Sequence, residues 1–198
     1  GVEAQSEKVW HQADKYEVPK VAFINKLDRV GASFPRVCQE INDKFAVSGV
    51  PIQLPVGEEA DFEGVLDLIR MEYCRFSGKL QEEVVRQEIP EHLQESAEEY
   101  REYMVETLAD YSDDIAEMFL EGQDIPAETL HNTVRELTVT NKIVPILAGS
   151  AKMRIGIQPL LDAMVEYLPS PSDKGEVYGW HPKDEKKIPV SPDPNEAF

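Results

Sequence analysis

Two short apolar runs, at residues 21–24 and 143–148, stand out in the hydrophobic pattern of this chain. Neither run alternates with polar residues, which is typical of strands that are buried on both faces. Helical spacing follows each run, and strands that alternate with helices favour a parallel sheet. The pattern therefore predicts an α/β fold with parallel strands at about residues 20–25 and 143–148.

Helices are predicted on either side of these two runs. The first has a predicted buried stripe of Val9, Trp10, Ala13 and Tyr16, and it ends before Pro19. A second helix is expected to begin near Pro35. The last helix is expected to direct six apolar side chains inward, namely Ile157, Leu160, Leu161, Met164, Val165 and Leu168.

The middle of the chain changes character. Extended stretches at residues 50–56, 64–76 and 79–88 are separated by glycines, and they predict a small antiparallel sheet. Three helices are predicted to follow, at residues 91–111, 113–120 and 126–138. The helix at 91–111 is strongly amphipathic, since its apolar positions recur at steps of three and four. Its opposite face is acidic and includes Glu98, Glu99, Glu102 and Glu106.

Charge restricts the partners that suit this chain. It carries 20 basic and 38 acidic residues, for a net charge of −18. Nucleic-acid phosphates require Lys and Arg, so we predict no direct nucleic-acid contact for this segment. An acidic helix face suits a basic patch on a protein partner. The alternative is that the acidic side chains are only a solvated surface that keeps the chain soluble.

Composition indicates a globular protein of the cytoplasm. Hydrophobic residues make up 41% of the chain, which is enough for a core. No apolar stretch approaches the about 18 residues that cross a bilayer, so no membrane partner is expected. Two cysteines and four scattered histidines give neither a disulfide framework nor the spacing of a metal site.

A short polar motif follows each of the two apolar runs. Asn-Lys-Leu-Asp occupies residues 25–28, and Gly-Ser-Ala-Lys occupies residues 149–152. Ligands of open α/β sheets bind at the carboxyl ends of strands, so both motifs are expected at one edge. Taken singly, each motif could be turn chemistry, because Asn, Asp and Gly are common turn residues. Their joint occurrence favours a site that recognises guanine.

Guanine recognition follows from the donor and acceptor pattern of the base. An Asp carboxylate can accept two parallel hydrogen bonds from the N1–H and the exocyclic amine, and adenine lacks this pair of donors. A bidentate base contact is worth about 1–3 kcal/mol of discrimination. The Asn amide can bond the purine and tie neighbouring loops together, and the Lys stem can lie along the base. The backbone N–H of Ala151 is expected to face guanine O6.

The phosphate-binding half of a nucleotide site is missing from this sequence. No Gly-x-x-x-x-Gly-Lys-Ser/Thr loop is present, and Gly78-Lys79 is followed by Leu80. Residues 61–64 match the Asp-x-x-Gly element that senses the γ-phosphate, but they come after the Asn-Lys-x-Asp motif instead of before it. We interpret them as a turn, and we expect no GTP hydrolysis by this chain alone.

A whole-length resemblance adds to the motifs. The stretches at residues 1–7, 22–29 and 149–171, which include Gln-Pro-Leu-Leu-Asp-Ala at 158–163, closely resemble the bacterial-type elongation factor G family. Residues 29–149 separate Asp28 from Ser150, which is room for an inserted domain. The resemblance implies a partial P-loop-GTPase-type three-layer α/β domain with an inserted α+β subdomain. Leu27 replaces the Met common in the family, and its side chain is expected to point into the fold.

The resemblance implies a ribosome-dependent GTPase that promotes movement of tRNA and mRNA during protein synthesis. It places the catalytic His, the phosphate loop and the Mg²⁺ ligands upstream of Gly1, so no catalytic or metal residue is expected here. It also implies that the inserted subdomain contacts the ribosomal stalk protein through the acidic helix. The residues implied to bind the guanine of GTP or GDP are Asn25, Lys26, Asp28, Ser150, Ala151 and Lys152.

Four segments are expected along the chain. Residues 1–48 and 141–171 are predicted parts of the GTPase domain, residues 49–140 the inserted subdomain, and residues 172–198 a linker into a second domain that begins at 193–195. The start at Gly1, close to a packed helix, suggests a fragment. Three alternatives remain open. The first is a paralogue devoted to ribosome recycling, including an organellar form, and the second is a non-catalytic acidic interaction module. The third is an unrelated α/β nucleotide enzyme whose motifs are coincidental and which should show no guanine preference.

Overall fold

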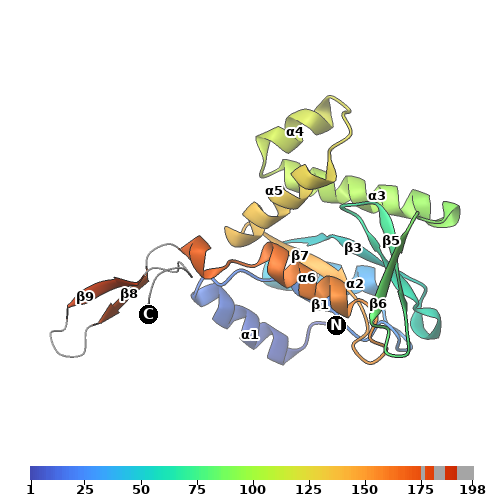
Figure 1. Ribbon diagram of the computed structural model, residues 1–198, viewed down its shortest axis with the longest axis horizontal. Coiled ribbons are helices and arrows are strands. Elements are labelled where there is room, and N and C mark those ends of the chain that lie inside the picture. Colours follow the sequence, from blue (N-terminus) through green and yellow to red (C-terminus); the bar gives the residue numbers. More distant parts are fainter. Residues whose placement is uncertain (175–176, 181–185, 191–198) are drawn as a thin grey trace. The chain divides into compact units, whose positions relative to one another are not determined.

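The computed structural model describes residues 1–174, 177–180 and 186–190. Gly1–Leu168 form one compact unit, and a second unit begins at Pro169. The first unit combines a three-stranded parallel sheet with a four-stranded antiparallel sheet (Figure 1). This mixed α/β architecture confirms the predicted fold class.

The parallel sheet brings the two apolar runs together. Strand β1 (Ala22–Ile24) pairs with β7 (Ile143–Ala148), and β7 pairs on its other side with β2 (Ser48–Pro51). Both pairings are parallel, with Ile24 opposite Ala148. All six residues of β7 are buried, as expected for a central strand covered on both faces. The carboxyl ends of β1 and β7 therefore lie side by side.

The extended stretch predicted at residues 50–56 is divided between two sheets, which corrects its assignment to the antiparallel sheet alone. Strand β2 belongs to the parallel sheet, and β3 (Gln53–Val56) begins the antiparallel one. Ile52 joins them, because its N–H donates to Ile146 O at 3.0 Å and its carbonyl accepts from Leu68 N at 3.0 Å. The boundary expected between residues 48 and 49 thus falls inside a strand.

The antiparallel sheet has the order β3–β4–β5–β6. Strand β4 is Gly64–Asp67, β5 is Glu72–Ser77 and β6 is Glu83–Gln87. A turn at residues 68–71 separates β4 from β5, although residues 64–76 were predicted to be extended throughout. Residues 79–82 were also predicted to be extended, but they form a turn before β6. Gly78 has φ +89° at this point, so the chain reverses before β6 begins.

Helices occupy most of the segments predicted for them. In Figure 1, α6 (Ile157–Tyr167) lies in front of the parallel sheet and α2 (Phe34–Phe45) behind it. Ser33 caps α2 by accepting a hydrogen bond from Arg36 N at 3.4 Å, and Pro35 occupies the first turn. The remaining α-helices described in the first unit are α1 (Ala4–Lys15), α3 (Glu91–Ala109), α4 (Asp113–Leu120) and α5 (Ala127–Val139), and a 3₁₀ helix spans Glu59–Asp61.

The buried face of α6 differs from the prediction. Its buried residues are Pro159, Ala163 and Tyr167, while Leu161, Met164 and Val165 are exposed by 56%, 47% and 81%. The helix is apolar on most of its circumference, so its sequence alone cannot select the side that packs. The side carrying Pro159, Ala163 and Tyr167 faces the inserted antiparallel sheet, with which it lines a small hollow.

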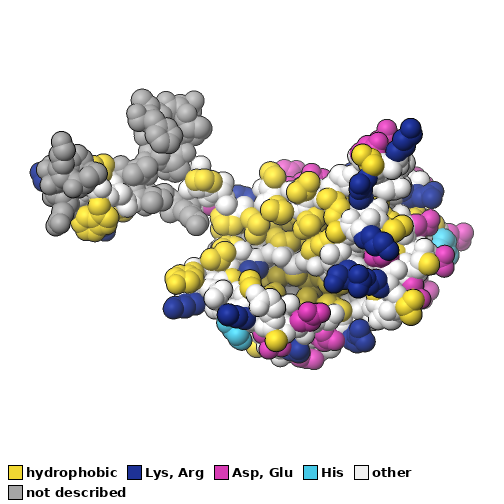
Figure 2. Space-filling model, turned by 90° about the horizontal axis from the view of Figure 1, so that it is seen from below, with side chains coloured by type: hydrophobic (Ala, Val, Ile, Leu, Met, Phe, Trp, Pro, Cys, Tyr) yellow, Lys and Arg dark blue, Asp and Glu magenta, His cyan; other side chains and the backbone are white. Residues whose placement is uncertain are grey.

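The buried stripe predicted for α1 is also wrong in part. No residue of α1 is fully buried, and Val9 and Tyr16 are 53% and 71% exposed. Trp10 is half-buried and stacks on Phe45 of α2, with ring centroids 4.0 Å apart. Figure 2 shows the face seen from below, where apolar side chains gather over a broad area.

The second unit contains a short 3₁₀ helix, Pro171–Lys174, and an antiparallel hairpin of β8 (Val177–Trp180) and β9 (Lys187–Val190). The expected linker at 172–198 thus includes paired strands. The second-domain start expected at residues 193–195 lies outside the described residues. Within the described part of the chain, no helix has the length and apolar character needed to cross a membrane.

Candidate guanine-recognition site

The two sequence motifs meet at the carboxyl edge of the parallel sheet. Gly149 N donates to Ile24 O at 3.0 Å, which extends the pairing of β1 and β7 by one residue. Leu27 N donates back to Gly149 O at 3.3 Å. These two backbone bonds fix the Asn-Lys-Leu-Asp loop against the Gly-Ser-Ala-Lys loop before any side chain contributes.

Asn25 ties the loops together with its side chain. Its Oδ1 accepts hydrogen bonds from Lys26 N at 2.7 Å and from Ala151 N at 2.9 Å. The loop-tying role expected for this amide is therefore present. The Ala151 N–H, expected to face guanine O6, is directed at Asn25 in this structure. The Asn25 side chain is exposed, so its Nδ2 group can be reached by a ligand.

Ser150 connects the second motif to the carboxylate of the first. Its hydroxyl donates to Asp28 Oδ1 at 2.5 Å and accepts from Met153 N at 3.2 Å. Ser150 is fully buried, whereas Asp28 is half-buried. The hydrogen bond from Ser150 lowers the pKa of the Asp28 carboxyl group, and the charges of Lys152 and Arg29 act in the same direction. The lowered pKa favours the ionised carboxylate, which is the state that accepts hydrogen bonds from a base.

Residues 26 and 27 turn the chain at the site. Lys26 has φ +68°, a left-handed conformation, and its side chain is exposed beside the exposed Asn25. Leu27 is 5% exposed and belongs to the hydrophobic core. This burial confirms that Leu27 points into the fold, and it anchors the loop that displays Lys26 and Asp28.

Two glycines allow the second loop to be this compact. A Cβ atom on Gly149 would lie 2.5 Å from the Phe23 ring and 2.6 Å from Ile155 O. Gly156 has φ +82°, and a Cβ there would lie 2.4 Å from Ala148 O. Reciprocal backbone bonds of 2.9 and 3.1 Å between Ser150 and Ile155 close the loop. Sequence reasoning missed Gly156, although a lone Gly just before a helical pattern is a turn signal.

The antiparallel sheet and its β5–β6 connection contact the segments that flank the second loop, which the sequence did not indicate. Ala148 N donates to Gln53 Oε1 of β3 at 3.4 Å, and Gln53 is buried. Gln158, in the first turn of α6, donates to Gln81 O at 2.6 Å. Strand β3 and the connection between β5 and β6 thus contact the chain on both sides of residues 149–152.

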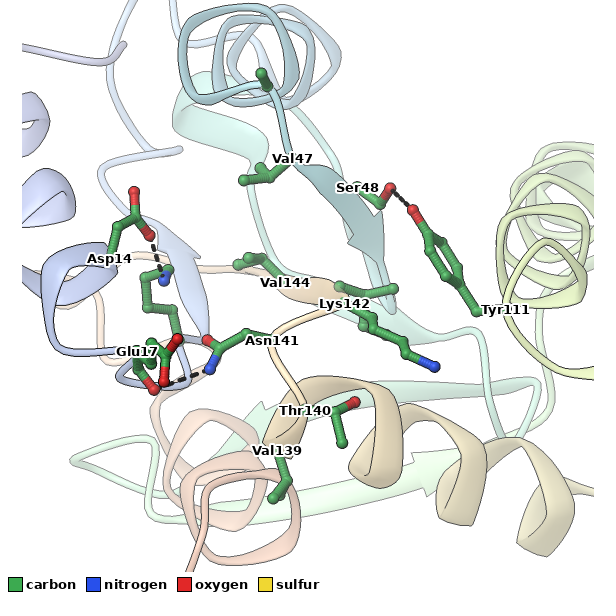
Figure 3. A pocket seen from close by; sticks show the side chains of 13 residues that line it. Asp14, Glu17, Val47, Ser48, Tyr111, Val139, Thr140, Asn141, Lys142 and Val144 are labelled. Carbon is green, nitrogen blue, oxygen red and sulfur yellow. Dashed lines mark hydrogen bonds and ion pairs between the residues drawn. The ribbon is translucent and has the colours of Figure 1, made fainter.

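A separate hollow of about 640 Å³ lies at the opposite end of the parallel sheet (Figure 3). Its polar groups largely satisfy each other, since Lys20 pairs with Asp14 at 2.7 Å and Ser48 bonds Tyr111 at 2.6 Å. Because α/β sheets bind ligands at the carboxyl ends of their strands, this hollow is not the base-recognition site.

The remaining predicted features lie in other segments, except for Lys152 in the second loop. Asp61 ends a short 3₁₀ helix, Glu59–Asp61, and Gly64 begins β4, so the segment 61–64 leads from that helix into the antiparallel sheet. The four glutamates predicted to bind a partner are all exposed on α3, at Glu98, Glu99, Glu102 and Glu106. Lys152 is exposed next to Ala151. Among the described residues, no group of three or more His, Cys, Asp or Glu side chains is arranged to hold a metal ion.

Comparison with known proteins identifies the class. The family described as elongation factor Tu GTP binding domain matches residues 1–170. This chain therefore belongs to the elongation factor Tu GTP-binding domain family, and the guanine-nucleotide-binding fold predicted from its motifs is confirmed.

Individual relatives are more specific. The chain is 46% identical to elongation factor G of Thermotoga maritima, and the match covers 100% of this chain and 29% of the relative. It is also 46% identical to elongation factor G of Fervidobacterium nodosum, covering 100% of this chain and 28% of the relative. The expected resemblance to elongation factor G is thus confirmed over the whole chain, which spans under a third of the length of these relatives.

A solved structure supports the fold. A crystal structure of a protein from Thermus thermophilus superposes with a TM-score of 0.77. The match covers 90% of this chain and 26% of the other, at 24% sequence identity. At that identity the likeness bears on the fold alone.

Proposed function

We propose that this chain is the guanine-recognising part of a ribosome-dependent translational GTPase that promotes movement of tRNA and mRNA. The observation that carries the proposal is the joining of the two motifs by the Ser150–Asp28 and Asn25–Ala151 hydrogen bonds. The similarity to elongation factor G along the whole chain supports the same function. A cytoplasmic location follows from that function.

Each residue of the site has a distinct role in this proposal. The Asp28 carboxylate accepts hydrogen bonds from N1–H and the exocyclic amine of guanine, and Ser150 holds it ionised and oriented. The Lys26 stem lies along the plane of the base. The Ala151 N–H donates to Asn25 Oδ1 in this structure, and in this proposal it leaves that acceptor to bond guanine O6 when the nucleotide is present. Lys152 adds a second positive charge near the base.

The chemistry of GTP cleavage is assigned to other parts of a longer protein. This sequence has no phosphate-binding loop, and the described residues provide no cluster of ligands suited to Mg²⁺. We therefore infer that residues outside this chain bind the phosphates and the metal ion. We call the longer protein that contains this chain and those residues the parent protein. The isolated chain is expected to hydrolyse GTP no faster than buffer that contains no protein.

The acidic face of α3 is proposed to bind the ribosomal stalk protein. The four exposed glutamates, Glu98, Glu99, Glu102 and Glu106, form no ion pair or hydrogen bond through their carboxylates with the described residues. A basic surface of a partner would complement them and speed association. Charge reversal at Glu102 and Glu106 in the parent protein is expected to slow stalk-dependent GTP turnover, and unchanged stalk binding would contradict this role.

Ribosome-stimulated GTP turnover and mRNA movement of the parent protein test the main proposal. The Asp28→Asn variant is expected to lose GTP turnover and mRNA movement when GTP is supplied. It is expected to show turnover and mRNA movement when xanthosine triphosphate is supplied instead, because an Asn amide can donate to the xanthine carbonyl. The matched control is Asp61→Asn, in the connection between β3 and β4, which should change neither. Ribosome splitting without mRNA movement would favour the recycling paralogue, and activity indifferent to Asp28 would contradict the guanine site.

A further inference from the structure

A hollow of about 300 Å³ lies between α2 and α3, well away from the guanine-recognition site. Its α2 wall includes Gln39 and Asn42, and its α3 wall consists of Glu99, Tyr100 and Tyr103. The buried Cys38 contributes to its lining. The hollow therefore combines a carboxylate with two aromatic rings over a partly apolar floor.

The polar groups of the α2 wall are already engaged within the protein. Gln39 Nε2 donates to Asp43 Oδ1 at 2.8 Å, and Asn42 Oδ1 accepts from Gly49 N at 2.8 Å. The carboxylate of Glu99, by contrast, makes no hydrogen bond or ion pair with any described residue. The hollow thus offers one unpaired anionic group to a ligand.

The two tyrosines are placed to contact a ligand beside that carboxylate. Tyr103 is 43% exposed although it is a large aromatic residue, and Tyr100 is half-buried. Burial raises the pKa of the Tyr100 phenol, with Cys38 and Glu99 acting in the same direction, and Glu99 and Tyr100 line the same hollow. An aromatic face next to a carboxylate suits an ammonium or guanidinium group. The apolar floor suits the methylene stem of such a side chain.

The charge around the hollow favours a basic partner. Glu95, Glu98, Glu102 and Glu106 are exposed on the same helix, and the whole chain has a net charge of −18. Arg36 is a basic side chain on α2, and it is already paired with Glu40 at 3.8 Å. A small anion or an acidic peptide would be repelled here, whereas a basic protein surface would be attracted.

We propose that this hollow receives one arginine or lysine side chain of the stalk protein, held between the Tyr103 ring and the Glu99 carboxylate. The inference rests on the proposed docking of that protein to α3, and it adds a defined anchor to a contact otherwise based on charge alone. Interfaces of this kind concentrate their binding energy in a few aromatic and charged residues. Glu99 and Tyr103 are then coupled, because they hold the same cation.

Calorimetric titration of the parent protein with purified bacterial stalk protein tests the anchor. Tyr103→Leu keeps apolar volume but removes the aromatic face, and Glu99→Gln removes the charge with little change of shape. Each is expected to weaken binding about 3- to 30-fold. The double variant is expected to weaken binding less than the product of the two single effects. Tyr16→Leu, at a tyrosine 71% exposed directly after α1, and Glu91→Gln, at the start of α3, are matched controls expected to bind normally.

The outcomes separate the anchor from the docking proposal on which it rests. If charge reversal at Glu102 and Glu106 weakens binding but Tyr103→Leu and Glu99→Gln do not, the anchor is wrong and charge-based docking stands. If none of these variants weakens binding, both are wrong. If the fold-losses in affinity of Tyr103→Leu and Glu99→Gln multiply fully in the double variant, the two residues make separate contacts. That result would contradict the proposal that they hold the same cation. Thermal melts of each variant confirm that the fold is retained, as expected for exposed positions.

Discussion

The Ser150 hydroxyl donates a hydrogen bond of 2.5 Å to Asp28 Oδ1, although the two residues lie 122 positions apart in the sequence. This bond joins the carboxylate expected to read guanine to the loop expected to complete the pocket. It also orients Asp28 with one oxygen engaged, which leaves the other available to a base. Both nucleotide affinity and the titration of Asp28 should therefore depend on Ser150.

Removal of the Ser150 hydroxyl should weaken guanine-nucleotide binding. In Ser150→Ala, the backbone hydrogen bonds to Ile155 still hold the loop in its fold. The Asp28 carboxylate loses its partner and is free to rotate. GDP affinity of the parent protein is expected to fall roughly tenfold, the usual range for a hydrogen bond to a charged group. Fluorescence titration with a labelled GDP measures the change. Wild-type affinity in this variant would show that Ser150 does not position the carboxylate.

The titration of Asp28 should reflect the same bond. Its pKa is lowered in the folded protein from an ordinary value of 3.8, chiefly by Ser150. A lowered folded pKa gives stability that is fully present above the unfolded pKa and is lost as pH falls through the folded pKa. NMR titration of the Asp28 carboxyl group in the isolated chain is expected to give a midpoint below 3.8 that rises in Ser150→Ala. Equal midpoints in the two proteins would show that Ser150 is not the cause of the shift.

Gly156 should be far less tolerant of substitution than another glycine with a similar backbone conformation. Its φ is +82°, and a Cβ would lie 2.4 Å from Ala148 O. Gly122 has φ +67°, but a Cβ there would meet no atom within 4 Å, so Gly122→Ala carries only the backbone cost. Urea unfolding is expected to show a loss of about 3 kcal/mol for Gly156→Ala and about 1 kcal/mol for Gly122→Ala. Similar losses for both would mean that the loop adjusts freely.

The isolated chain should associate with itself at high concentration. Strand β1 has a partner on one side only, in the order β1–β7–β2, and unpaired edges promote association. Exposed apolar side chains add to this tendency, among them Leu161 and Val165 on α6. Sedimentation analysis is expected to show weak dimers that decrease when Leu161 and Val165 are both replaced by Lys. A monomer whose melting is sharp and independent of concentration would count against this prediction.

The meeting of the two motifs at one edge of the sheet was predictable from the sequence because its signals are local. Each motif directly follows an apolar run, and parallel pairing then brings the motifs to one edge. The hydrogen bond between Asn25 and Ala151 was not predictable in detail, since a backbone N–H in such a loop can turn to either a base or a neighbouring side chain.

The errors occurred where packing partners decide the outcome. The helix α6 is apolar on most of its surface, so Leu161 and Val165 were expected inside although Pro159 and Ala163 occupy the buried face. Strand β2 begins with Ser48 and Gly49, which do not resemble a buried strand, and only its pairing with β7 identifies it. In both cases the deciding contacts come from distant parts of the chain.

The most direct test of the guanine site is a titration of the parent protein, wild type and Asp28→Asn, with GDP, ADP and xanthosine diphosphate. The wild type is predicted to bind GDP tightly and to bind ADP and xanthosine diphosphate weakly. Asp28→Asn is predicted to reverse the preference to xanthosine diphosphate, because the Asn amide can donate to the xanthine carbonyl. No guanine preference in the wild type, or a preference that the substitution leaves unchanged, would contradict the assignment of Asp28 to the base edge.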